Sequence, residues 1–316
     1  MADRGLVIGH FNPLHVGHEF FVRTVAGLSE GVTIGLLAGD DQSIELKVRE
    51  HWLQETFPDH QIVTLDQPLD LLGRVNLAEF AAHYNHDPSM RELAASLNLP
   101  LRVIDPAREA VRVSGGDIRA DLAGYWQYLS EASRVHLAKR VCLFGPESTG
   151  KTTLTRELAE RYQTSMMPEF GRIHDEVYQP TEWRADMMVS LAQTHQAMQR
   201  ALMPRVNRLL FEDTDALATV LWSQAFVGEV SDWFEGHVEL ADLYLLMDID
   251  VPWVADDLRV LGDEAARKRF FDAARQLLDE RGANYVVVSG SWDERRTKAV
   301  GAVDQLLHAA GLSSSS

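Results

Sequence analysis

The 316-residue chain has a single cysteine, an excess of acidic over basic residues, and no apolar run long enough to cross a membrane. Cys142 alone excludes an intramolecular disulfide and is typical of a reducing compartment, so we expect a cytoplasmic location. The 30 lysines and arginines against 47 acidic residues give a net charge of −17, which disfavours a polyanion-binding surface. We therefore expect no nucleic-acid partner and no membrane partner. Any anion site must be built locally, from loops and a few cationic side chains.

Short apolar runs alternate with helical spacing along both halves of the chain. Strands are expected at 6–8, 32–38, 62–65 and 101–104, and again at 141–144, 209–211, 243–247 and 285–288. This alternation predicts an α/β fold with two doubly wound parallel-sheet domains. The length agrees with about 150 residues per domain. We expect the domains at 1–135 and 136–312, followed by a serine-rich tail at 313–316.

The segment 145–152 reads GPESTGKT and lies between a predicted strand and a predicted helix. In this context G-x-x-x-x-G-K-T indicates a P-loop, whose backbone N–H groups and helix N-terminus surround a β-phosphate. We expect Lys151 to bridge the β- and γ-phosphates and the Thr152 hydroxyl to bind Mg²⁺. The alternative, a glycine-rich turn with an incidental lysine, does not explain the flanking strand and helix. The predicted phosphate-binding residues are Gly145, Glu147, Ser148, Thr149, Gly150, Lys151, Thr152 and Thr153.

Acidic residues follow the predicted strand at 209–211, where a P-loop protein needs a metal-binding carboxylate. We expect Asp213 or Asp215 to hold Mg²⁺ and the other to accept a proton from a substrate hydroxyl. A polar strand end without a function is the alternative. Arg259 and the basic cluster 267–269 are candidates for a lid over the transferring phosphoryl group. A solvated helix face explains 267–269 equally well.

A different signature, GHFNPLHVGH at 9–18, follows the first predicted strand. The spacing of His15 and His18 places both imidazoles on one face of a beginning helix. Two imidazole donors at a helix N-terminus suit a phosphate whose negative charge grows during reaction. Gly17, which has no side chain, is expected to let this anion approach the backbone. The alternatives are a metal-binding pair, for which no third ligand is evident, and two incidental histidines.

A partner for this loop follows at 113–119, which reads VSGGDIR. Ser114 and the free N–H groups after it form an anion-binding helix start, and Arg119 can reach the same phosphates. Alone this segment is a weak signal. Combined with His15 and His18, it predicts a second segment that binds the same triphosphate.

These motifs resemble those of a known family. The segment 9–18 matches the G-x-F-x-P-x-H-x-G-H signature of the nucleotidyltransferase superfamily, and 114–119 matches its late S-x-x-x-x-R element. With a P-loop half behind them, the chain resembles the bifunctional NadR-type enzymes of NAD salvage. The resemblance covers nearly the whole chain, including 169–172, 213–215 and 253–259 in the second half.

The resemblance implies a Rossmann-like nucleotidyltransferase at 1–135 and a P-loop ribosylnicotinamide kinase at 136–312. The kinase would phosphorylate nicotinamide riboside with ATP. The transferase would adenylate nicotinamide mononucleotide to NAD and release pyrophosphate. ATP is then the co-substrate of both steps, with Mg²⁺ as the cofactor. Neither step needs a covalent enzyme intermediate, so positioning and charge stabilisation should carry the catalysis.

Motifs and resemblance together assign the candidate site residues. The catalytic candidates are His15, His18, Arg119, Lys151 and Asp213. The ATP-binding candidates outside the P-loop are Gly9, Phe11, Asn12, Gly17, Ser114 and Arg259. The substrate candidates are Glu169, Asp215, Trp253 and Trp292, and the metal candidates are Thr152 and Asp213. Both tryptophans resemble the family residues that sandwich the nicotinamide ring, which is a favourable environment for a cationic pyridinium.

Two departures from the family pattern bear on the first domain. The stretch 68–100 shows no apolar strand with the S-E-x-x-G-like turn that relatives carry before their V-D-P-x-R segment, here IDPAR at 104–108. We therefore expect an incomplete nucleotide pocket, which makes transfer less secure than phosphorylation. Some relatives also begin with a DNA-binding helix-turn-helix, whereas this chain opens on the first strand, which argues against a repressor.

Two other functions fit the same motifs. One is a riboside kinase whose first domain is weakened or only senses nucleotides. The other is a regulator that binds NAD or ATP without turnover and acts through a protein partner. A product assay separates them, because only the bifunctional enzyme releases pyrophosphate from the mononucleotide and ATP. The sequence leaves a homo-oligomer open.

Overall fold

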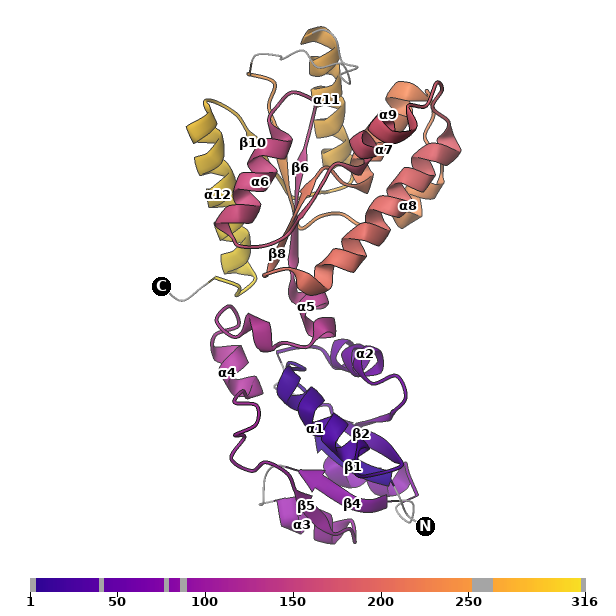
Figure 1. The fold of residues 1–316 in the computed structure, drawn as a ribbon, viewed down its shortest axis with the longest axis vertical. Helices are drawn as coiled ribbons and strands as arrows, with labels where there is room; N and C mark the ends of the chain where they lie inside the picture. Colours follow the sequence, from indigo (N-terminus) through magenta and orange to yellow (C-terminus); the bar gives the residue numbers. More distant parts are fainter. Residues whose placement is uncertain (1–3, 40–42, 77–79, 86–89, 252–263, 314–316) are drawn as a thin grey trace. The chain divides into compact units, whose positions relative to one another are not determined.

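The computed structural model describes residues 4–39, 43–76, 80–85, 90–251 and 264–313. The chain divides into two compact units, Met1–His136 and Leu137–Ser313. Each unit contains one five-stranded sheet whose neighbouring strands are all parallel (Figure 1). The predicted fold class, two doubly wound parallel sheets, is therefore confirmed. Within the described residues no helix is both long and apolar enough to span a membrane.

The sheet of the first unit has the order β3-β2-β1-β4-β5, with β1 at its centre. Its strands are β1 (Arg4–Gly9), β2 (Gly31–Leu37), β3 (Gln61–Leu65), β4 (Phe80–Asn85) and β5 (Leu101–Val103). The inner residues of β1 and β2 are buried without alternation, which is typical of a parallel strand covered on both faces. The chain reverses its direction of winding at β1, and ligands of open α/β sheets bind at such a switch point.

Helices cover this sheet and carry the second halves of both predicted motifs. They are α1 (Val16–Ala26), α2 (Leu46–Thr56), α3 (Arg91–Ser96), α4 (Gly115–Ala120) and α5 (Glu131–Leu137), with 3₁₀ turns at Pro68–Gly73 and Trp126–Tyr128. One apolar cluster joins Leu6 and Ile8 of β1 to Phe80 of β4 and to Leu97 and Leu99 around α3. This cluster fixes the sheet against α3.

Strand β4 corrects the expectation that 68–100 contains no strand. It pairs in parallel with β1 on one side and with β5 on the other, so it is an inner strand of the sheet. Its sequence FAAHYN gives a weak apolar signal, although Phe80, Ala82 and Tyr84 alternate and are buried. The turn that follows falls in 86–89, outside the described residues.

The sheet of the second unit has the order β10-β9-β6-β8-β7, with β6 at its centre. Its strands are β6 (Lys139–Phe144), β7 (Met166–Met167), β8 (Leu209–Asp213), β9 (Leu243–Met247) and β10 (Tyr285–Val288). All five residues of β8 and of β9 are buried. The two-residue β7 is too short to be recognised from a sequence pattern.

Helices pack on both faces of the second sheet (Figure 1). They are α6 (Lys151–Arg161), α7 (Phe170–Tyr178), α8 (Ala185–Leu202), α9 (Ala216–Phe226), α10 (Trp233–His237), α11 (Glu264–Glu280) and α12 (Trp292–Ala309), with a 3₁₀ turn at Met203–Arg205. One core cluster joins α8, α9 and α11 to β6 and β9, whereas α6 and α12 lie on the other side of the sheet. Cys142 is a buried member of this cluster, as its apolar surroundings predict.

Candidate functional site

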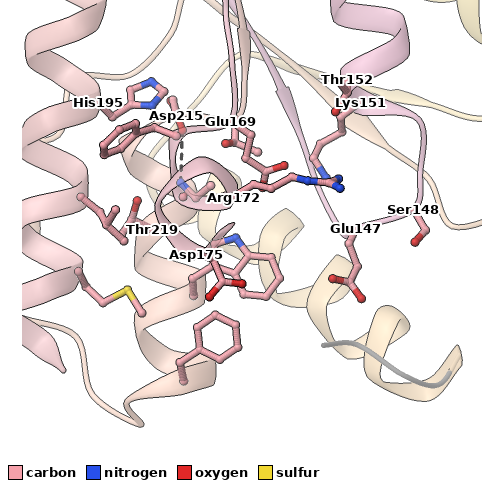
Figure 2. Close-up of a pocket in the computed structure, with 18 of the residues that line it drawn as sticks. Glu147, Ser148, Lys151, Thr152, Glu169, Arg172, Asp175, His195, Asp215 and Thr219 are labelled. Carbon is pink, nitrogen blue, oxygen red and sulfur yellow. Dashed lines mark hydrogen bonds between the residues drawn. The ribbon is translucent and has the colours of Figure 1, made fainter. Parts of the chain in front are cut away.

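The second unit contains a cavity of about 390 Å³ at the carboxyl ends of β6 and β8. Its walls come from the P-loop, from α7 and α8, and from the turn between β8 and α9 (Figure 2). Of the predicted P-loop residues, Glu147, Ser148, Gly150, Lys151, Thr152 and Thr153 line it. The candidate kinase residues Glu169 and Asp215 line the same cavity from other elements.

The P-loop backbone takes the sharp turn that its glycines permit. Gly145 and Gly150 have φ angles of +118° and +88°, in the region that favours glycine. A side chain at Gly145 would also approach the Met247 carbonyl oxygen to 3.0 Å. The Thr149 hydroxyl donates to the Pro146 carbonyl oxygen at 2.8 Å, which closes the loop on itself. The loop therefore leads directly into the N-terminus of α6, where unpaired N–H groups favour an anion.

Lys151 lies inside this loop. Its ammonium donates to the carbonyl oxygens of Gly145 at 3.0 Å and Pro146 at 2.7 Å. The residue is only 6% exposed, so its charge acts in a medium less polarisable than water. This places a cation beside the N–H groups of the loop.

Thr152 and Asp213 meet at the floor of the site. The Thr152 hydroxyl donates to Asp213 Oδ2 at 2.5 Å, while Asp213 Oδ1 is buried with no hydrogen-bond partner in the described part of the chain. Burial raises the pKa of Asp213, against the opposing effect of Lys151 and the Thr152 hydroxyl. A hydroxyl and a carboxylate oxygen with spare acceptor capacity fit the oxygen ligands that Mg²⁺ prefers.

The described residues contain no cluster of three or more His, Cys, Asp or Glu side chains suited to a metal ion. Thr152 and Asp213 alone would leave most of the coordination shell of Mg²⁺ to water and phosphate oxygens. This is the usual arrangement for Mg²⁺ bound together with a nucleotide, because the ion gives up its waters reluctantly.

Glu169 faces the P-loop from the segment between β7 and α7. Burial raises the pKa of its carboxyl, and Lys151 opposes this shift. Glu169, Arg172, Lys151 and Thr152 line the same cavity, and Figure 2 shows the Arg172 side chain extending toward Lys151. A carboxyl that is easier to protonate than usual, next to a phosphate-binding loop, is suited to accept a proton from a substrate hydroxyl.

Asp215 lines the cavity but its oxygens are already engaged. Oδ1 accepts from the N–H groups of Leu217 and Ala218 at 3.0 and 3.3 Å, which caps α9, and Oδ2 accepts from the Tyr244 hydroxyl at 2.7 Å. Burial and the neighbouring Glu212 raise its pKa. Both oxygens of Asp215 therefore accept hydrogen bonds that hold the turn after β8.

Aromatic side chains form one wall of the cavity. Phe226 stacks between Trp183 and Trp222, with ring centroids 5.6 and 5.2 Å away and interplanar angles of 13° and 17°. All three line the cavity, together with Asp175 of α7. This wall suits a flat, cationic ring. None of these residues belongs to a motif, so the sequence offered no sign of them beyond their residue type.

Trp292, which was expected at the nicotinamide ring, packs against the P-loop and α6. Its indole packs against Gly150, where an added Cβ would approach the ring to 2.7 Å, and its Nε1 donates to Glu157 at 3.3 Å. It does not line the cavity. Trp253 and Arg259 fall in 252–263, outside the described residues.

The basic cluster after this gap is divided between core and surface. Arg267 is 3% exposed and donates to the Val251 carbonyl oxygen at 3.5 Å, whereas Lys268 pairs with Asp272 at 2.9 Å on the exposed face of α11. None of 267–269 lines the cavity. The solvated-face interpretation therefore fits Lys268, and Arg267 is a buried residue of the fold.

In the first unit, the signature loop connects β1 to α1. His15 is the N-cap of α1, and its Nδ1 accepts the Gly17 N–H at 3.1 Å. A neutral His15 ring must then carry its proton on Nε2. The His18 ring stacks on that of His15 with centroids 3.7 Å apart. The spacing of three thus brings both imidazoles together at the start of the helix.

Gly17 lines the small cavity of this unit and lies against the His15 ring. A Cβ at this position would meet the His15 ring at 2.9 Å, so the missing side chain makes room for the histidine. Gly9 ends β1, and Phe11 and Asn12 are buried in the loop. The Ser43 hydroxyl donates to Asn12 Oδ1 at 3.3 Å.

The segment 114–119 lies against this loop. Arg119 Nη1 donates to the Asn12 carbonyl oxygen, and a Cβ on Gly115 would approach the same oxygen to 2.8 Å. Ser114 caps α4, accepting from the Asp117 N–H at 3.1 Å and donating to the Asp117 carboxylate at 2.6 Å. A small cavity of about 50 Å³ lies here, lined by His15, Gly17, His18, Gly115, Asp105 and Arg108. Arg108 was not a candidate from the sequence.

The family described as AAA domain matches residues 140–295. The trifunctional NAD biosynthesis/regulator protein NadR of Salmonella typhimurium is 25% identical over 96% of this chain and 83% of its own length. Its Escherichia coli counterpart is 24% identical over the same shares. The chain resembles NadR proteins over nearly its whole length.

Solved structures agree on the fold. A NadR protein in complex with NR has a TM-score of 0.72 at 20% identity, covering 96% of each chain. A NadR protein in complex with NAD and AMP-PNP has a TM-score of 0.70 at 20% identity, covering 100% of this chain and 98% of its own. The predicted resemblance to the NadR-type family is thus confirmed.

Proposed function

We propose that this chain is a bifunctional enzyme of NAD salvage. Its second unit phosphorylates nicotinamide riboside with ATP, and its first unit adenylates nicotinamide mononucleotide to NAD with release of pyrophosphate. The observation that carries the proposal is the pair of phosphate loops, each at the carboxyl end of the central strand of its own parallel sheet. The NadR relatives and the ligands named for their structures support the choice of substrates.

In the kinase step the riboside 5′-oxygen forms a bond to the γ-phosphorus of ATP, and the bond from that phosphorus to the β,γ-bridging oxygen breaks. ADP leaves and the hydroxyl proton goes to Glu169, whose raised pKa suits a proton acceptor. Lys151, the N–H groups of the P-loop and Arg172 stabilise the charge on the phosphoryl oxygens. Thr152 and Asp213 would hold Mg²⁺, which would neutralise phosphate charge.

The riboside base rests on the wall formed by Trp183, Phe226 and Trp222. Its pyridinium is cationic, so an aromatic face and the Asp175 carboxylate both favour it over a neutral base. Trp253 remains a candidate for the other face of the ring.

In the transfer step a phosphate oxygen of the mononucleotide attacks the α-phosphorus of ATP, and the bond to the α,β-bridging oxygen breaks, so that pyrophosphate leaves. His15 and His18 donate to the phosphate oxygens whose charge grows in the transition state. Arg119 holds the loop through Asn12 and adds a positive charge near it. Gly9, Phe11, Asn12, Gly17 and Ser114 shape this site.

A riboside kinase whose first unit only senses nucleotides is the second candidate, favoured by the small size of the cavity at His15 and His18. Strand β4 supplies the strand that the sequence pattern of 68–100 did not show, which supports an active first unit. Purified protein with Mg-ATP should convert the riboside to the mononucleotide, and the mononucleotide to NAD and pyrophosphate. Phosphorylation without pyrophosphate release would favour the second candidate, and tight ATP binding with neither product would show that the chain is a sensor.

A further inference from the structure

Each unit contains an arginine that is buried beneath its phosphate loop. Arg49 of α2 is 1% exposed and Arg295 of α12 is 0% exposed. Burial lowers the pKa of both guanidinium groups. Burying a charged side chain is costly unless its hydrogen bonds are satisfied, so the partners of these two groups show what they hold together.

Arg49 binds four backbone carbonyl oxygens. Nη1 donates to His10 at 2.7 Å and to Leu37 at 2.9 Å, Nη2 donates to Ala38 at 2.7 Å, and Nε donates to Ile44 at 3.0 Å. His10 belongs to the signature loop, whereas Leu37 ends the neighbouring strand β2 and Ala38 follows it. One guanidinium thus ties the loop to the carboxyl edge of the sheet.

Arg295 has the same role in the second unit. Nη1 donates to the carbonyl oxygen of Thr149 in the P-loop at 3.3 Å, Nη2 to that of Asp248 after β9 at 3.0 Å, and Nε to that of Gly290 after β10 at 2.9 Å. It also pairs with the Asp250 carboxylate. The P-loop is thereby tied to the ends of two strands.

We infer that Arg49 and Arg295 are positioning residues for nucleotide phosphates, each serving the loop of its own unit. A guanidinium that holds a loop carbonyl keeps that oxygen directed away from the phosphates, so the adjoining N–H groups can face them. It also places positive charge beneath an anion site. Neither residue lines a cavity wall that would contact the substrate. The inference rests on the proposed function only for its activity measurements.

The test uses the full chain with Arg49→Met, Arg49→Lys, Arg295→Met and Arg295→Lys. Lys47 on α2 and Arg296 on α12 are exposed cations of the same helices, so Lys47→Met and Arg296→Met are matched controls. Both activities are measured on each variant with ATP and the second substrate varied in turn. Calorimetric binding of AMP-PNP and thermal unfolding complete the set.

We expect Arg49→Met to lower kcat of adenylyl transfer and raise KM for ATP, each by about 10-fold, because a charged hydrogen-bond network is lost. KM for the mononucleotide and the kinase activity should stay unchanged. Arg295→Met should give the mirror result, with only the kinase affected. The lysine variants, which keep the charge and part of the bonding, should recover part of each loss, and the controls should match the wild type.

A merely structural role gives a different pattern. It lowers the folded fraction and therefore kcat, while KM for ATP and the affinity for AMP-PNP stay unchanged. That result, or an equal loss of both activities from either variant, overturns the inference. If the methionine variants do not fold, the lysine variants carry the test. A wild type that binds AMP-PNP without turnover refutes the proposed function alone, and the AMP-PNP affinities of the variants still decide this inference.

Discussion

The two phosphate loops occupy equivalent places in their sheets and differ in how they are built. Both follow the central strand and lead into a helix. The P-loop uses positive-φ glycines and a lysine, so that backbone N–H groups and one ammonium form the anion site. The loop of the first unit uses two stacked imidazoles, one of which caps its own helix. The carboxyl edge of a parallel sheet can therefore carry a phosphate loop built mainly from backbone N–H groups or one built mainly from side chains.

The cavities differ in the same way. The cavity of the second unit, at about 390 Å³, reaches from the P-loop to a wall of aromatic side chains. The cavity at the histidines is much smaller, at about 50 Å³. The two cavities lie in different units and share no lining residue. Changing the side chains of one loop should therefore lower only the activity of its own unit.

The largest expected effect is from Lys151→Ala. It should lower riboside phosphorylation by about 10³-fold, because the buried cation inside the P-loop is lost, and leave adenylyl transfer intact. Product assays with riboside and mononucleotide in parallel measure both. Equal loss of the two activities would contradict the independence of the loops.

Glu169→Gln should lower phosphorylation by about 10²-fold, because the proton acceptor is lost. In the wild type, burial raises the pKa of Glu169, so kcat/KM should fall with decreasing pH at a midpoint above the ordinary glutamate value of about 4.3. This limb should vanish in the glutamine variant. A limb that persists there would point to Asp213, whose pKa is raised as well.

His18→Ala should reverse the pattern of the lysine variant. Adenylyl transfer should fall by about 10²-fold through loss of a donor to the growing phosphate charge, while phosphorylation is retained. Thermal unfolding of the variant serves as a control, since His18 also packs on His15 and Phe11. Unchanged pyrophosphate release would show that the stacked imidazoles are not catalytic.

The smallest effect concerns the aromatic wall. Trp222→Ala should raise KM for the riboside by about 10-fold through loss of the cation–π face, and Trp222→Phe by less. A neutral purine or pyrimidine nucleoside, tested as a competing substrate, should be affected less than the cationic riboside. Equal effects on both would indicate that the wall only packs against the base.

Much of the fold follows from the alternation of apolar runs, because parallel strands covered on both faces are almost continuously apolar. The inner strand β4 could not be predicted in this way, because His83 and Asn85 break its apolar run. Its pairing with β1 and β5 identifies it as a strand. Likewise β7 is two residues long and exists only through its pairing with β8.

The sequence by itself determined the two loops, since glycine, lysine and histidine at fixed spacing impose a local geometry that needs no distant partner. It also determined their order and their flanking strands. Tertiary structure alone decided what surrounds them. Trp183 and Trp222 join one wall, Trp292 packs behind the P-loop, and Arg49 and Arg295 reach loops far away in the chain. Such contacts depend on how the helices pack on the sheet, and no spacing along the chain encodes them.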